Sequence, residues 1–373
     1  MISIFGMEMT QDQIGQSVGR FDQIAGITPF RFSSGRADGC RALRVTNGGL
    51  TFTAVADRAL DVSQIDFHGT PLCWRSPNGE AAPAYYEPEA DDWLRTFFGG
   101  LFTTCGLSNF GPAGEDRWGK FGLHGRINCL PAEEVRCSHT WDGEQYVLEI
   151  SGTVRQTKVL GEQLTLRRTL RTSMGSNRLE LHDVVTNEGA AATPHMILYH
   201  CNGGFPLLAD GSRLYVSTRK ITPRDEEAAS GRDVWNEGAA PQPGFAEQVF
   251  IHEPVGCGDG RAAALLVNER LNGGNGIALR VRFDTKQLPA FFSWRMLGAH
   301  TYVMGMEPAN CPTIEGRVAA GQRGTLPMLE AGASRRYDLE FDVLHQADLI
   351  KTAIRSIHHA SANQTTYALS GKG

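Results

Sequence analysis

The stretch GIALRVRFD, residues 276–284, decides the fold class because apolar and polar side chains alternate along it. Its large apolar residues, at the odd positions from Ile277 to Phe283, share one side, and the even positions share the other. A period of two is the pattern of a β-strand, and one polar face per strand is typical of an antiparallel sheet. The stretch therefore predicts a half-buried strand of an antiparallel sheet.

Further segments of the chain show the same alternation. Each is short, has one polar face and is bounded by Gly, Pro, Asn or Asp, as strands usually are. They are residues 50–55, 146–150, 163–171, 179–185, 213–218 and 336–344. Strands do not alternate with long helices, which argues against a parallel α/β sheet. The expected fold class is all-β, a large antiparallel β-sandwich with few short helices.

One helix is expected near the end of the chain, where Ile350, Ile354 and Ile357 share a helical face. Two stretches rich in Pro and Gly, residues 75–92 and 224–244, lie between segments of the same strand type, so neither is a linker. We therefore expect one domain over residues 1–373, with its core at about 40–345 and a helical tail at 347–361. The two stretches are expected to be binding loops or lids.

Composition and charge exclude several classes of protein. The chain is 41% hydrophobic and 21% charged, which fits a globular protein rather than a disordered one. A net charge of -5, with no basic stripe, argues against nucleic acid as a partner. Neither a signal peptide nor a membrane-spanning run is evident, so we expect a cytoplasmic protein with no membrane partner. None of the 8 cysteines forms a C-x-x-C pair and their spacings match no zinc motif, so no metal site is expected. In a chain this long without a secretion signal, the cysteines are expected to be reduced.

Two segments place a histidine among glycines. GLHGRINCLPA carries His124 and Arg126 around Gly125, which would let a ligand approach the backbone closely. LYHCNGGFPLL delivers His200 from the end of an apolar strand into a glycine-rich loop that begins at Asn202. Each histidine is either presented to a cleft or satisfied by hydrogen bonds within a turn or the core.

Two other segments carry charges in unusual surroundings. VMGMEPANCP holds Glu307 in a run otherwise without charge. Burying a lone carboxylate is costly, so Glu307 is either paired with an arginine such as Arg295 or Arg126, or poised for chemistry. DRALD offers Arg58 either to a ligand hydroxyl or carboxylate, or to a structural pair with its neighbouring aspartates.

Asn109, His252 and Trp294 complete the set of candidate residues. Asn109 lies in the glycine-rich segment TTCGLSNFG, and His252 follows a strand in VFIHEP. Trp294 could stack on the face of a sugar ring or belong to the core.

These segments, in this order, resemble the aldose 1-epimerases. HGRINCLPA, LYHCNGGFPLL and MEPANCP, preceded by GGLFTTCGLSNFG, are similar to a bacterial branch of the galactose mutarotase-like superfamily that carries a domain-of-unknown-function label. WRMLGAHTYVMGMEPANCP is the most specific phrase of this resemblance, which covers residues 43–343. It implies a supersandwich of two large antiparallel sheets, with a sugar cleft on one concave face.

The resemblance also implies roles for the candidate residues. Glu307 would be the general base, His200 the general acid and His124 a sugar-binding residue. The other expected substrate-binding residues are Arg126, Arg58, Asn109, Asn202, His252 and Trp294. The studied enzymes hold sugar hydroxyls with an acidic residue that has no evident counterpart here, and His252 stands at a comparable place, so the sugar is not identified.

The implied activity is an interconversion of sugar anomers by acid–base ring opening, without a cofactor. The expected partner is a small-molecule sugar, and the expected state is a monomer or a homodimer. A non-catalytic carbohydrate-binding or regulatory protein could share the fold. A metal-dependent, cupin-like sugar isomerase would normally show an H-x-H pair, which the sequence lacks. A glycoside hydrolase needs paired carboxylates, for which Asp57, Asp61 or Asp284 could serve beside Glu307.

Overall fold

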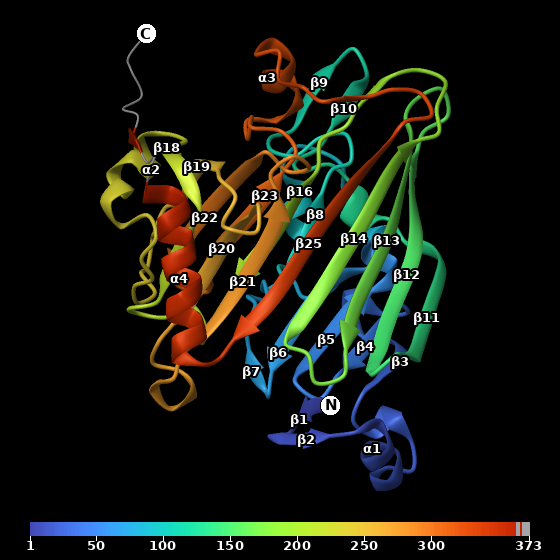
Figure 1. Ribbon diagram of the computed structural model, residues 1–373. Helices are drawn as coiled ribbons and strands as arrows, with labels where there is room; N and C mark the ends of the chain where they lie inside the picture. Colours follow the sequence, from blue (N-terminus) through green and yellow to red (C-terminus); the bar gives the residue numbers. More distant parts are fainter. Residues whose placement is uncertain (363–365, 368–373) are drawn as a thin grey trace.

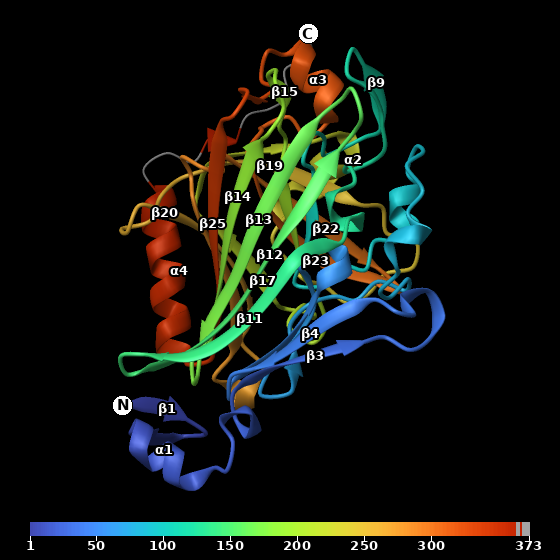
Figure 2. The same ribbon diagram turned by 90° about the vertical axis from the view of Figure 1, so that its right-hand side faces the viewer.

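The computed structural model describes residues 1–362 and 366–367, and within them the expected all-β, mainly antiparallel fold is confirmed. An eight-stranded sheet packs against a seven-stranded and a five-stranded sheet, and one apolar core joins all three. Figures 1 and 2 show the long strands of the eight-stranded sheet side by side, with the N-terminal hairpin and helix α1 below them.

Hydrogen bonds between neighbouring strands set the spatial order of each large sheet. The eight-stranded sheet contains, in that order, β11 (Ala132–Asp142), β12 (Gln145–Thr157), β13 (Gln163–Ser173), β14 (Arg178–Asn187), β25 (Ser334–Leu344), β21 (Ile277–Asp284), β20 (Arg261–Asn268) and β17 (Arg213–Val216). The seven-stranded sheet contains β26 (Thr366–Tyr367), β18 (Thr218–Pro223), β19 (Gln248–Pro254), β22 (Ala290–Gly298), β23 (Thr301–Ala309), β16 (Leu198–Gly203) and β8 (Phe102–Cys105). The five-stranded sheet contains β3 (Gly26–Arg31), β4 (Arg41–Thr46), β5 (Leu50–Val55), β6 (Asp61–Phe67) and β7 (Thr70–Pro71).

Short two-stranded ribbons and four α-helices lie outside these three sheets in the described residues. Short ribbons pair β1 (Ile2–Ile4) with β2 (Met7–Met9), β9 (Gly114–Asp116) with β10 (Gly119–Phe121), and β15 (Thr193–Pro194) with β24 (Met328–Leu329). The α-helices of the described residues are α1 (Gln11–Ser17), α2 (Glu226–Ser230), α3 (Gly316–Gln322) and α4 (Ala347–Ala362). In the described part of the chain, none of the helices combines the length and the apolar character needed to cross a bilayer.

The segment 276–284 forms β21, between β20 and β25. Val281 pairs with Ala264 on one side and with Phe341 on the other, and all three are buried in the main core. On the opposite face, Ala278 is also buried, because α4 covers it with residues such as Ile350. The predicted C-terminal helix is thus confirmed, and Figure 1 shows it lying along this end of the eight-stranded sheet.

The core differs from the sequence expectation in two ways. It begins earlier in the chain than residue 40, since Ile2 and Ile14 belong to it. It also contains a charge, because Arg168 on β13 lies fully buried with its guanidinium 2.6 Å from both Asp61 and Asp183. A buried arginine with two carboxylate partners and full hydrogen bonding is compensated, and removing one partner would be strongly destabilising. This cluster ties β6, β13 and β14 together beneath β16.

The two long loops are partly ordered by local structure. The loop 75–92 contains a 3-10 turn at Pro83–Tyr85, and another follows at Asp92–Arg95. The loop 224–244 contains the short helix α2, which the sequence analysis did not predict. Asp225 caps this helix by accepting the N–H of Ala228 at 2.9 Å. Both loops contribute side chains to the same cleft.

Candidate active site

His200 and Glu307 lie side by side because their strands are neighbours in one sheet. β16 runs antiparallel to β23, with Cys201 opposite Met306. Those two side chains point into the core. The next residues along, His200 and Glu307, therefore point to the other face, since successive side chains of a strand alternate. They meet at the floor of a cleft on the outer face of the seven-stranded sheet.

The two groups are close and nearly buried, and the carboxylate oxygen beside the imidazole has no hydrogen bond. His200 Nε2 lies 3.4 Å from Glu307 Oε1, and the residues are 6% and 3% exposed. The approach is not aligned as a hydrogen bond, and Glu307 Oε1 has no other partner in the described chain. The His200 imidazole also faces the side chain of Asn202, which favours its charged form. Buried polar atoms are rarely left unpaired, so this carboxylate oxygen is available to a ligand.

Burial shifts both pKa values in the direction that removes charge. Desolvation raises the pKa of Glu307 to about 8, and the negative charge of Glu247 adds to this shift. Desolvation lowers the pKa of His200 to about 4. Between these two values the pair holds a single proton, which either residue can carry.

The cleft above the pair has a volume of about 870 Å³, within the range of small-molecule sites. Trp74, Trp93, Phe97 and Trp294 form much of its wall. The Trp294 ring stands nearly perpendicular to the His200 imidazole at 5.2 Å, and the Phe97 ring lies 5.0 Å from it. These rings keep water from His200 and offer flat apolar surfaces to a ligand.

His124 reaches the same cleft, with its ring 5.9 Å from that of His200. Its backbone is left-handed, at φ 55°, and Gly125 follows at φ 72° with no space for a side chain. The His124 Nδ1 accepts the N–H of Gly111 at 3.3 Å, which leaves the proton of the neutral ring on Nε2. Burial, together with the nearby His200, lowers the pKa of His124 to about 3.

One wall of the cleft was missed by the sequence analysis. Arg224 lies 2.7 Å from Asp225 and 3.0 Å from Glu247. Glu247 also accepts the indole N–H of Trp294 at 2.9 Å and so holds that ring in place. The only signal in the sequence was that Arg224 and Asp225 open the long loop 224–244.

Gly305 makes the room that Glu307 occupies. It lies two residues before Glu307 on the same face of β23, and a Cβ at this position would lie 2.5 Å from Glu307 Oε1 and 2.8 Å from the Trp294 Cβ. A glycine inside a strand often marks such a close approach, so the sequence VMGME did carry this signal.

Comparisons with known proteins now identify the family. The family model described as "Domain of unknown function (DUF4432)" matches residues 37–343. The chain belongs to the DUF4432 family. No curated protein sequence matches it closely enough to count as a relative.

Solved structures share the fold of this DUF4432 chain and confirm the resemblance to mutarotase-like proteins. A candidate aldose 1-epimerase from Klebsiella pneumoniae has a TM-score of 0.86 and 25% identity, over 98% of this chain and 95% of that one. A galactose mutarotase-like protein from Clostridium acetobutylicum has a TM-score of 0.57 and 13% identity, over 87% and 100%. A galactose 1-epimerase from Lactobacillus acidophilus has a TM-score of 0.56 and 12% identity, over 86% and 99%. The last two likenesses show the fold alone.

Within the DUF4432 chain, four of the nine predicted site residues line the cleft: His124, His200, Trp294 and Glu307. Arg58 was expected at the substrate, but it is 1% exposed and is not among the residues that line the cleft. Its guanidinium donates to the backbone carbonyls of Ala81, Thr96 and Asn128. A buried cation that satisfies three carbonyls anchors loops, and it leaves no group free for a sugar.

The two predicted asparagines hold the backbone around the cleft. Asn109 donates to the carbonyl of Gly122, among others, and accepts the N–H of Arg317, which fixes the loop that carries His124. Asn202 is fully buried and donates to the His200 carbonyl at 2.7 Å. Both asparagines thus contact the loops of the site and do not line the cleft.

His252 and Arg126 lie elsewhere. His252 shares the inward face of β19 with Phe250, where its Nε2 is 2.8 Å from Ser293 Oγ. Burial there lowers the pKa of His252 to about 3. Arg126 lies outside the cleft, with its guanidinium 5.7 Å from the centre of the Tyr86 ring. Within the described residues Glu307 has no arginine partner, so the alternative of a structural ion pair is not realised.

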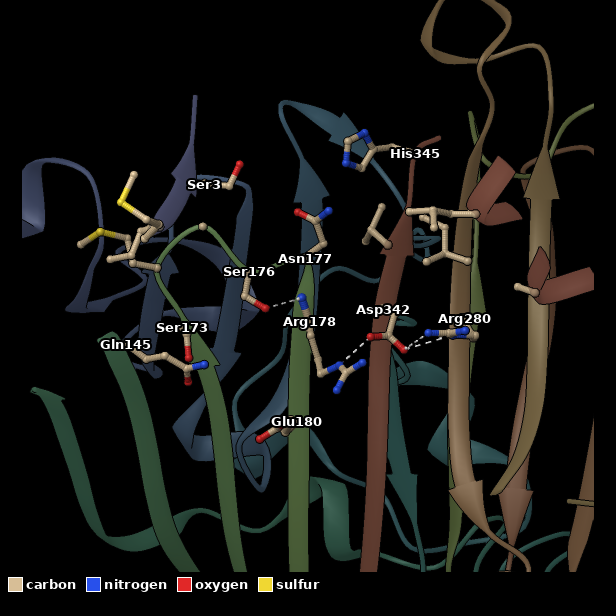
Figure 3. Close-up of a pocket in the computed structure, with 18 of the residues that line it drawn as sticks. Ser3, Gln145, Ser173, Ser176, Asn177, Arg178, Glu180, Arg280, Asp342 and His345 are labelled. Atoms are coloured by element: carbon tan, nitrogen blue, oxygen red, sulfur yellow. Dashed lines mark hydrogen bonds and ion pairs between the residues drawn. The ribbon is translucent and has the colours of Figure 1, made fainter. Parts of the chain in front are cut away.

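A cavity of similar size, about 890 Å³, lies on the outer face of the eight-stranded sheet. Figure 3 shows that Asp342 in this cavity is paired with two arginines, Arg178 at 2.6 Å and Arg280 at 3.0 Å. None of its lining side chains has a buried polar atom without a hydrogen bond, as Glu307 has in the cleft. Among residues 1–362 and 366–367, no three His, Cys, Asp or Glu side chains gather into a set of metal ligands.

Proposed function

We propose that this protein interconverts the anomers of a ring-form sugar, with Glu307 and His200 as its acid–base pair. The observation that carries the proposal is the pair itself: an unpartnered carboxylate oxygen 3.4 Å from an imidazole, at the floor of an aromatic-lined cleft. The structural likeness to a candidate aldose 1-epimerase supports it. We infer an isomerase of carbohydrate metabolism that acts in the cytoplasm on a small sugar and works as a monomer or a homodimer.

The reaction needs one base and one acid on the two sides of the anomeric centre. The Glu307 carboxylate takes the proton of the anomeric hydroxyl, and the electron pair of that O–H bond forms the C=O bond of an aldehyde. The bond from the anomeric carbon to the ring oxygen breaks, and the ring oxygen takes a proton from the His200 imidazolium. The aldehyde turns about its bond to the next carbon, and the same steps in reverse close the ring with both protons returned.

The single proton of the pair must lie on His200 when the ring opens. Moving it from Glu307 to His200 across a pKa difference of about 4 units costs about 5 kcal/mol. The resulting ion pair, with charges 3.4 Å apart at an effective dielectric constant of about 20, regains about 5 kcal/mol. The two terms offset each other. Sugar hydroxyls that donate to the Glu307 carboxylate would then favour the reactive form.

Other residues of the cleft would position the sugar. The Nε2–H of His124 can donate to a sugar oxygen, because Nδ1 already accepts the Gly111 N–H. The ring of Trp294, held by Glu247, offers a face to the C–H side of the sugar. Each of these contacts fixes orientation and transfers no proton.

The test is exchange NMR between the two anomers of hexoses, pentoses and uronates, with wild-type protein, Glu307→Gln and His200→Asn. Each substitution should lower the exchange rate by about 10²–10⁴-fold. The dissociation constant of the sugar should stay within about fivefold. His252→Asn removes a buried histidine outside the cleft and serves as the matched control. Full exchange by Glu307→Gln would refute the assigned base, and a sugar that binds the wild type without exchanging would identify a binding protein instead.

A further inference from the structure

A separate cavity of about 660 Å³ lies behind the loop that carries His124. Its walls come from the β9–β10 hairpin, the turn between β12 and β13, the segment that follows β14, and Arg317 of α3. Figure 1 shows β9 and β10 at the top of the molecule, next to α3. No residue lines both this cavity and the candidate active site.

The cavity is strongly cationic. Arg117, Lys120, Arg126 and Lys158 line it, and within residues 1–362 and 366–367 none of them is close enough to a carboxylate to form an ion pair. Glu162 is the one carboxylate of the described lining. A further cation of the lining, Arg317, is already neutralised by Asp116 at 2.8 Å.

Three of these cations are exposed and Arg126 is half-buried, so water screens their mutual repulsion, but together they give the hollow a positive potential that attracts anions. The protein as a whole carries a net charge of -5, so this cluster does not follow from its composition. The Lys158 ammonium lies close to Gly119, which follows the turn of the β9–β10 hairpin: a Cβ added to this glycine would be 3.7 Å from the Lys158 Nζ atom. That arrangement brings it toward the hairpin that carries Arg117 and Lys120.

The cavity also offers surfaces for an organic group. The rings of Tyr86 and Trp118 belong to its lining, with Arg126 lying over the first and Arg117 over the second, at 5.7 and 4.0 Å. Its volume falls in the range of small-molecule sites. The positive groups surround a hollow and do not form the extended stripe that a polynucleotide requires, so a small ligand fits better.

We propose that this cavity is a second ligand site, for a small organic anion that carries at least two negative charges. Phosphorylated and polycarboxylated metabolites share that chemistry, and both would be held by charge-assisted hydrogen bonds from arginine and lysine. The site does not depend on the proposed anomer exchange, because no acid–base residue of the cleft takes part in it.

Isothermal titration with inorganic pyrophosphate and with citrate, at constant ionic strength, tests the proposal on the full chain. Wild-type protein should bind at least one of the two anions saturably at one site. Lys120→Gln/Lys158→Gln should weaken that binding at least about tenfold, or 1.4 kcal/mol. Lys286→Gln/Lys351→Gln also removes two exposed lysines, but away from the cavity, and should change it less than about twofold. Circular dichroism verifies that both variants fold.

The two anions distinguish a site for phosphorylated ligands from a site for polycarboxylates. Binding of pyrophosphate alone assigns the site to phosphorylated ligands, and binding of citrate alone assigns it to polycarboxylates. The proposal is overturned if neither anion binds saturably, or if both lysine pairs weaken binding equally. It is likewise overturned if a single-stranded oligonucleotide binds at this cavity and the small anions do not.

Discussion

Replacing Glu307 by Gln should stabilise the folded protein, and the gain should grow with pH. Burial raises the pKa of this carboxyl group from 4.5 to about 8. The folded state therefore binds the proton more tightly than the unfolded state, which makes the free energy of unfolding fall as pH rises through this window. A glutamine has the shape of the protonated acid but never ionises, so the variant escapes that loss.

The size of the effect follows from the two pKa values. One proton held only by the folded state changes the free energy of unfolding by about 1.4 kcal/mol per pH unit. The difference between variant and wild type should therefore grow by about 2.5 kcal/mol from pH 5 to pH 7, and level off above pH 8. It does not matter which member of the pair carries the proton, because His200 and Glu307 together hold one.

Urea denaturation at pH 5, 7 and 9, followed by tryptophan fluorescence and circular dichroism, measures these differences. Glu8→Gln, an exchange of an exposed glutamate on β2, is the matched control for the loss of one charge. A difference between Glu307→Gln and wild type that stays flat across this range would show that Glu307 ionises normally in the folded protein. The proposal of a poised carboxyl group would then fail.

Further variants probe the rest of the site. The rate of anomer exchange by the wild type, measured by polarimetry, should be constant between about pH 4 and pH 8. A rate that instead changes with a single pKa of about 6.5, the ordinary pKa of histidine, would contradict a proton shared by His200 and Glu307. Glu247→Gln removes a negative charge that raises the pKa of Glu307, so the exchange rate should begin to fall at a lower pH than in the wild type. Gly305→Ala should lower kcat/KM at least about tenfold, because its Cβ displaces Glu307, whereas Gly258→Ala, which meets open space, should not. Arg58→Met should lower the free energy of unfolding, measured by urea denaturation, by about 3 kcal/mol or more, because three buried carbonyls lose their donor. Arg126→Met should lower it by less than about 1 kcal/mol. Equal losses would show that Arg58 does not anchor the loops.

The strands of the sandwich could be read from the sequence because their pattern is local. The alternation at residues 276–284 and 336–344 predicted β21 and β25 within two residues of their observed bounds. The same reasoning overlooked Arg168 as an inward residue of β13, because the partners that compensate it come from β6 and β14. The helix α2 in the loop 224–244 was not predicted, although Asp225 is a residue type that favours the start of a helix.

The residues of the candidate site were likewise predictable only in part from the sequence. The isolated charge of Glu307 and the strand-end position of His200 marked both residues in the sequence. His252 carried a similar signal but faces the core, because β19 presents its even-numbered residues to the eight-stranded sheet. Arg58 was equally visible, yet the carbonyls that it satisfies come from three separate loops.

The sequence alone determined the alternating strands, the C-terminal helix and the kinds of residue available for acid–base chemistry, since these depend on neighbours along the chain. Only the tertiary structure decided which face of each strand became the cleft. It also decided that His200 and Glu307 lie 3.4 Å apart, with the Glu307 Oε1 atom lacking a hydrogen bond. The reason is physical: a strand fixes that its side chains alternate, but which side is buried depends on the sheet that packs against it.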